Sequence, residues 1–152
     1  MVRYSVVIKL MIFLFIAACA DDTAVQPPTE QERQRVLNDI EQVAIQINDL
    51  VGDATAENIE QCEMLPIGAK PCGGPWAYLI FSTAEVEKET LETLVETYTE
   101  LDDQRNRMFG LVSDCAYVGP PELSFEDNKC RGISAGAWNP GDILGVNNID
   151  DD

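Results

Sequence analysis

Two apolar stripes at helical spacing constrain the fold of this 152-residue chain more than any other feature. The first predicts an amphipathic helix of about 20 residues, which begins after a capping box at Thr29 and Glu32 and ends near Gly52. We expect this stripe to pack into the core; a coiled-coil partner is the alternative, although fewer than three heptads are present. The stripe consists of Val36, Ile40, Val43, Ile47 and Leu50.

The second stripe predicts a helix that begins at a capping box of Ser82 and Glu85 and ends at Gly110. The two stripes face each other most simply in an antiparallel two-helix hairpin. The second stripe consists of Val86, Leu91, Leu94, Val95, Tyr98, Leu101 and Met108.

Two helices cannot bury a sufficient core alone, so the segments around them must contribute to it. The apolar runs at 76–82, 115–118 and 122–125 predict short strands. We therefore expect a mainly α fold, at the margin of α+β, with a small antiparallel sheet or hairpin packed on the helix pair. The domain is predicted to span residues 29–131, and residues 132–152 to form a flexible acidic tail.

The N-terminus has the pattern of an export signal. A short basic region with Arg3 and Lys9 precedes an apolar run at 10–18. As a helix this run is only ~13 Å long, whereas the hydrocarbon core of a bilayer is ~30 Å thick. A permanent membrane span is therefore not expected, and residues 1–18 are interpreted as a signal peptide outside the fold.

The boundary Ile16-Ala17-Ala18-Cys19 resembles the lipobox of bacterial lipoproteins. The resemblance implies cleavage before Cys19 and attachment of acyl chains such as palmitate to it, which hold the protein at the membrane. Residues 19–28 then form a tether, and the protein lies at the cell envelope on its periplasmic side. Because Ala20 follows the cysteine instead of an aspartate, the resemblance favours the outer membrane over the inner. An ordinary cleaved signal with an unrelated cysteine is the alternative.

Four further cysteines are expected to form two disulfides on the oxidising side of the membrane. A helix of about 25 residues spans ~37 Å and separates the two cysteines before it from the two after it. We therefore expect the pairs Cys62–Cys72 and Cys115–Cys130. A crossed pairing that ties the segment 53–81 to the C-terminal hairpin is the alternative.

The acidic composition and the lack of histidine exclude several classes of function. Without residues 1–18 the chain has 8 basic and 27 acidic residues, a formal charge of −19 that repels nucleic acids. The sequence has 0 histidines, which removes the commonest general base, the usual zinc ligand and every Ser-His or Cys-His pair. We predict no catalytic residue, no cofactor and no metal site; a small carboxylate-based enzyme is the least favoured alternative.

Acidic side chains line one face of the second predicted helix. We interpret this row as a solvated face; binding of a basic partner or of loosely held divalent cations is the alternative. The terminal sequence NNIDDD has no calcium-loop spacing and predicts no calcium site. The row consists of Glu85, Glu89, Glu92, Glu96, Glu100 and Asp103.

The segment GAKPCGGPWAYLIFS, residues 68–82, is the least ordinary part of the chain. Glycine and proline around Cys72 predict a tight turn. A staple with Trp76 in the core explains the pattern without a ligand; a rigid loop that presents an aromatic side chain to another protein is the alternative. Thiol–disulfide chemistry is less favoured, because the C-x9-C spacing is not C-x-x-C and only Lys70 is a nearby cation. The binding residues predicted for the loop are Gly73, Gly74, Pro75, Trp76 and Tyr78.

Together with the SDC sequence at 113–115, this segment resembles a family of small secreted or lipid-anchored bacterial proteins that share GAKPCGGPW, a long helix, SDC and a last cysteine. The resemblance covers residues 62–131, implies no activity, and leaves the segment from Gly132 onward as an addition. The whole sequence predicts a cell-envelope lipoprotein that serves as a non-catalytic protein-binding or accessory module, with another envelope protein as its partner. A structural or envelope-stress role without a discrete ligand is the alternative.

Overall fold

The computed structural model of the protein describes residues 26–142. The predictions for the signal peptide, for Cys19 and for the last part of the tail fall outside these residues. The described chain forms α2 (Glu30–Val51), the 3-10 helix η2 (Ile59–Gln61), β1 (Cys62–Ile67), β2 (Ala77–Ser82), α3 (Lys88–Phe109), β3 (Glu122–Glu126), β4 (Lys129–Ile133) and β5 (Ala137–Trp138).

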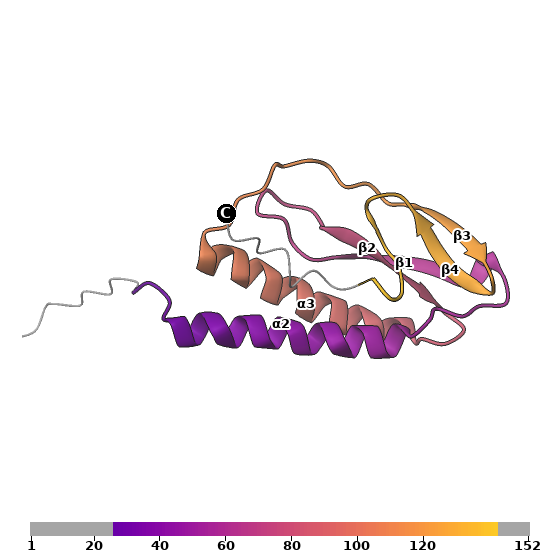
Figure 1. Ribbon diagram of the computed structural model, residues 1–152, viewed down its shortest axis with the longest axis horizontal. Coiled ribbons are helices and arrows are strands. Elements are labelled where there is room, and N and C mark those ends of the chain that lie inside the picture. The colour runs from indigo at the N-terminus through magenta and orange to yellow at the C-terminus, as the bar shows by residue number, and fades with distance from the viewer. Residues whose placement is uncertain (1–25, 143–152) are drawn as a thin grey trace, which may run out of the picture.

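The helix α2 begins and ends where the sequence predicts. The Thr29 side chain accepts from the Glu32 N–H, and the Glu32 carboxylate accepts from the Thr29 N–H at 2.7 Å, which completes the capping box. Gly52 follows its last residue. The stripe faces α3, which runs antiparallel beside α2 (Figure 1). Of its predicted residues, Val36, Ile40 and Ile47 are buried, whereas Val43 and Leu50 are only partly buried; Ala44 and Val51 of α2 are buried as well.

The helix α3 ends at Gly110, whose left-handed φ of 64° fits the predicted stop. Its predicted start is wrong, because Ser82 is the buried last residue of β2 and the helix begins only at Lys88. The Ser82 hydroxyl accepts from the Ala84 N–H within a turn, and the Glu85 carboxylate accepts from the Thr55 N–H at 3.2 Å. These two side chains therefore serve the turn and the preceding loop, and not a helix cap.

The expectation of a mainly α fold is wrong, because the described chain carries five strands in two sheets. β1 pairs with β2 antiparallel, and β5 adds to the other edge of β2 in parallel. β3 and β4 form a separate hairpin. The predicted strands 76–82 and 122–125 correspond to β2 and β3, whereas 115–118 is irregular. The protein is an α+β domain, with the helix pair along one side of the strands (Figure 1).

The strand β2 lies at the centre of the core. Leu79, Ile80 and Phe81 are all buried, because β2 is covered on both of its faces. On one side lie the helices; on the other, the Ile80 side chain packs so closely on Gly132 of β4 that a Cβ there would approach it to 3.0 Å.

The predicted boundary of the domain at residue 131 is also wrong, since it lies within β4. Trp138 of β5 is only 7% exposed, and its ring centroid lies 6.5 Å from that of Tyr98. The Asn139 side chain accepts from the Gly132 N–H at 2.7 Å, which holds this return segment on β4. Residues 132–142 therefore belong to the folded domain.

The predicted disulfides Cys62–Cys72 and Cys115–Cys130 are wrong, and the crossed pairs Cys62–Cys130 and Cys72–Cys115 are present. The reason is the direction of the β1–β2 hairpin, whose six-residue strands run about 20 Å along α3. At the start of α3, Glu63 pairs with Lys88 at 2.6 Å, whereas the Ala69 backbone bonds to Asp102 and Asn106 in the second half of the helix. Cys62 precedes Glu63 at the start of α3 and bonds to Cys130, whereas Cys72 lies at the other end of the hairpin and bonds to Cys115, which follows α3.

We expect Trp138→Ala to lower the free energy of unfolding by about 3 kcal/mol or more, because it empties a buried aromatic site. The exposed Ile133→Ala in the same segment is the matched control, with an expected change below about 0.5 kcal/mol. Urea denaturation followed by circular dichroism measures both. Equal stability of the two variants and the native chain would place residues 132–142 outside the cooperative domain.

Candidate functional site

The segment between β1 and β2, residues 68–76, is called the stapled loop here, because its Cys72 is bonded to Cys115 beyond the end of α3. It is the hairpin tip, and it reaches the end of the domain where α2 begins and α3 ends (Figure 1). A cation–π contact of 5.4 Å between Arg33 and Phe109 joins the two helices at this end.

Three polar side chains of α3 fix the backbone at the base of the loop. The Gly68 N–H donates to the Thr99 hydroxyl at 3.1 Å. The Ala69 N–H donates to the Asp102 carboxylate at 2.8 Å, and the Asn106 amide donates to the Ala69 carbonyl at 2.5 Å. Because these helix residues are three and four positions apart, they share one face and hold the loop as a unit.

Asp102 is a buried carboxylate, and its charge is balanced by Arg105, whose guanidinium lies 2.7 Å from it. Burial raises the pKa of Asp102 above its ordinary value of 3.8, although the Ala69 N–H and Arg105 oppose the shift. The anchor of the loop therefore carries a desolvation cost whenever this carboxyl is ionised.

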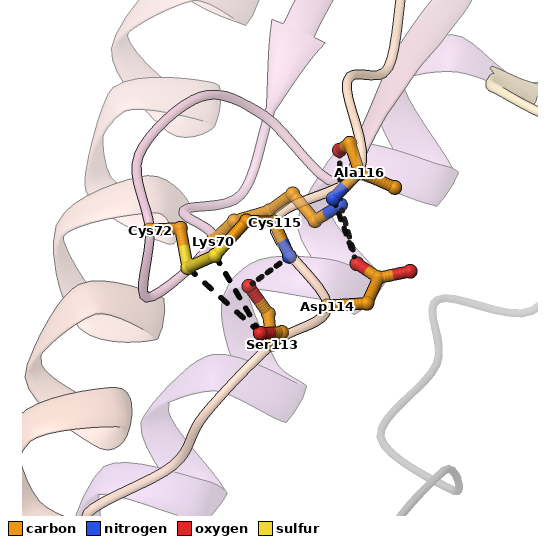
Figure 2. A network of polar contacts seen from close by, with 6 residues as sticks. All are labelled: Lys70, Cys72, Ser113, Asp114, Cys115 and Ala116. Carbon is orange, nitrogen blue, oxygen red and sulfur yellow. Dashed lines mark hydrogen bonds and ion pairs between the residues drawn. A yellow bond between two sulfur atoms is a disulfide. The ribbon is translucent and has the colours of Figure 1, made fainter.

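Lys70 connects the loop to the segment after α3 (Figure 2). Its side chain is buried, and its ammonium donates to the Ala116 carbonyl at 2.7 Å and to Asp114 at 3.4 Å. The same ammonium lies 5.2 Å from the ring centroid of Trp76. The Ala116 N–H, followed by Lys70, lowers the pKa of Asp114. The two contacts of the Lys70 ammonium thus join the same two segments as the Cys72–Cys115 bond.

The predicted binding residues lie in two different settings. Gly73 and Gly74 form the exposed turn at φ of 94° and 84°, closed by a hydrogen bond from the Lys70 N–H to the Gly74 carbonyl at 2.9 Å. Pro75 is half-buried, and Trp76 is 40% exposed, so Trp76 is not a core residue. Tyr78 lies away from the turn, half-buried within β2, where its N–H donates to Gly136.

The segment joined to the loop by the disulfide exposes further apolar side chains. Val112 is 90% exposed and Tyr117 is 87% exposed, on either side of Cys115. Isolated apolar residues are common on protein surfaces. These two and Trp76, however, belong to segments held together by one covalent bond and by Lys70, which gives this end of the domain an accessible apolar character.

The acidic row of α3 borders a shallow groove of about 490 Å³ against β1. Leu65 and Pro66 contribute its apolar side, together with Val95 of α3. The acidic residues that border the groove are Glu92, Glu96 and Glu100.

The other residues of the predicted row have different settings: Glu85 precedes the helix, and Asp103 forms an ion pair with Arg107. Within residues 26–142, no group of three or more acidic or cysteine side chains is placed to hold a metal ion.

Sequence reasoning missed the residues that support the loop. Asp102 and Asn106 continue the buried positions Leu91, Val95 and Tyr98 of α3 at the same helical spacing. Polar residues at such positions indicate a buried polar contact, and this signal was readable in the sequence. The role of Lys70 has no comparable signal, since it depends on Ala116, which lies far along the chain.

Comparisons of the chain with protein-family models, with curated proteins and with solved structures found no match. Among residues 26–142, no helix is long and apolar enough to cross a membrane.

We expect Gly68→Ala to displace Trp76, because a Cβ there would lie 2.7 Å from the indole Cδ1. Gly74→Ala is the matched control, since its φ of 84° is equally left-handed and its Cβ would meet nothing within 4 Å. Both substitutions cost about 1 kcal/mol of backbone energy. Only Gly68→Ala should alter the Trp76 emission spectrum in a Trp138→Phe background. Identical spectra for both variants would contradict the described packing.

The pH dependence of stability tests the Asp102 anchor. Because its folded-state pKa is raised, the contribution of Asp102 to stability is fully present below its ordinary pKa of 3.8 and is lost as the pH rises through the raised pKa. Asp102→Asn, which stays neutral, should therefore gain stability relative to the native chain between pH 3 and pH 7, as measured by urea denaturation. Glu100→Gln removes the same charge from an exposed position of α3 and is the control. A relative loss of stability for Asp102→Asn over this range would contradict the direction of the shift.

Proposed function

We propose that this protein is a non-catalytic binding module of the bacterial cell envelope, anchored by lipid at Cys19 on the periplasmic side and recognising another protein through the stapled loop. The observation that supports this proposal most directly is the exposure of Trp76 on a loop whose backbone is fixed at several points. Large aromatic side chains dominate the energetics of protein interfaces.

A fixed loop binds with a smaller loss of conformational entropy than a mobile one. The disulfide, the turn hydrogen bonds and the contacts with α3 all act on residues within ten positions of Trp76. The aromatic side chain is therefore held in one place before any partner arrives, which is what a recognition loop requires.

The position of the loop also fits attachment by lipid. The tether 19–28 leads directly into α2, and the stapled loop lies at the end of the domain where α2 begins (Figure 1). Ten residues extend to at most about 35 Å. With a lipid at Cys19, the loop stays near the membrane surface, so its partner is a protein bound to or embedded in that membrane.

The groove bordered by Glu92, Glu96 and Glu100 supports a second candidate contact, a basic segment of a partner protein. The three carboxylates follow one another at helical spacing, and the groove also offers apolar contacts from Leu65 and Pro66. A basic segment with apolar side chains is complementary to both features. The stapled loop remains the first candidate because it exposes the aromatic side chain of Trp76, whereas no aromatic side chain lines the groove.

The test is capture of a partner from envelope extract by the full chain with Cys19→Ser, which prevents lipidation. We expect a protein that binds the oxidised bait and an Ile59→Ala bait, whose exposed apolar residue lies elsewhere, but not a Trp76→Ala bait. Circular dichroism confirms that each bait is folded. Equal capture by the Trp76→Ala bait, or no capture by any oxidised bait, would contradict recognition through the loop.

A further inference from the structure

The two disulfides of the domain differ in their surroundings. Cys62 and Cys130 are buried among core residues, with Cys130 at 0% exposure. Cys72 and Cys115 are both exposed, and neither lies in a helix or a strand. A thiolate must reach a sulfur atom in order to attack it, so access favours the Cys72–Cys115 bond.

Opening this bond leaves the anchors on both sides of it in place. The base of the stapled loop stays bonded to Thr99, Asp102 and Asn106 of α3. On the other side, the Lys70 ammonium holds the backbone next to Cys115 through the Ala116 carbonyl. The core cluster includes Cys62 and Cys130 but neither Cys72 nor Cys115, so the staple lies outside the core.

The surroundings of the two sulfurs also suit the reduced form. The Ser113 carbonyl oxygen lies 3.8 Å from the Cys72 sulfur and 3.7 Å from the Cys115 sulfur (Figure 2). In the disulfide neither sulfur carries a hydrogen, so these contacts are not hydrogen bonds. After reduction, either thiol can donate its S–H to this oxygen. The backbone of Cys115 is left-handed, with a φ of 55°, a conformation that costs energy for a residue other than glycine.

We propose that Cys72–Cys115 is a site of thiol–disulfide exchange with a dithiol, which opens the staple while the domain remains folded. One thiolate of the dithiol attacks a sulfur of the pair, forms a mixed disulfide and releases the other cysteine as a thiolate, which takes up a proton. The second thiol of the dithiol, as its thiolate, then attacks the dithiol's own sulfur in the mixed disulfide and releases the remaining cysteine as a thiolate, which takes up a proton. The dithiol ends as a disulfide, and Cys72 and Cys115 end as two thiols. This site goes beyond the proposed function and does not rest on it, since the exchange involves no protein partner.

The test treats the folded full chain with increasing dithiothreitol, traps free thiols with iodoacetamide and measures the four cysteine peptides by mass spectrometry. We expect Cys72 and Cys115 to become labelled together, at least tenfold faster than Cys62 and Cys130, with an unchanged circular dichroism spectrum. Labelling of all four at one rate, earlier labelling of Cys62 and Cys130, or loss of the folded spectrum at the first step would overturn the proposal.

The variant Cys72→Ser with Cys115→Ser provides the second measurement. It should fold, lose the fast phase of labelling and keep the slow rate of Cys62 and Cys130. Failure of this variant to fold would show that the staple is required by the whole domain, which contradicts a local opening. A tenfold or larger acceleration at Cys62 and Cys130 would contradict it equally.

Discussion

The hydrogen bonds between α3 and the backbone at Gly68 and Ala69 determine where the rest of the site lies. They align the β1–β2 hairpin with the helix, so that its tip meets the helix end and its base meets the helix start. The choice of disulfides follows from this alignment, since Cys72 can then reach Cys115 but not Cys62. The exposed position of Trp76 follows as well. A buried carboxylate with a raised pKa thus supports the exposed loop that carries Trp76.

The elements that the sequence predicted correctly depend on local signals. The capping box at Thr29, the stop at Gly110 and the apolar run of β2 all act within a few residues. β1 contains Glu63 and Pro66, which are typical of loops but are tolerated in an edge strand. β5 has only two residues and forms because β2, far away in sequence, offers it an edge. Partners distant along the chain therefore decided the fold class, the domain boundary and the disulfides.

In the candidate site, too, local signals predicted some features correctly, whereas contacts between distant residues decided the others. Glycine and proline predicted the turn at 72–75, because left-handed backbone is a property of single residues. No local pattern shows whether Trp76 lies in the core or at the surface; in the structure its indole packs beside Gly68 and stays 40% exposed. In the sequence Lys70 is only a cation near Cys72, yet in the structure its buried ammonium joins Trp76 to the segment after α3.

The parallel pairing of β5 with β2 affects the order in which the domain can form. During synthesis, which begins at the N-terminus, β1, β2 and α3 are made well before residues 137–138. Until then, one edge of β2 lacks its neighbour, and Ile80 lacks the cover of Gly132. An open edge beside apolar residues promotes association between unfinished chains. The strongly acidic composition opposes such association between chains through charge repulsion.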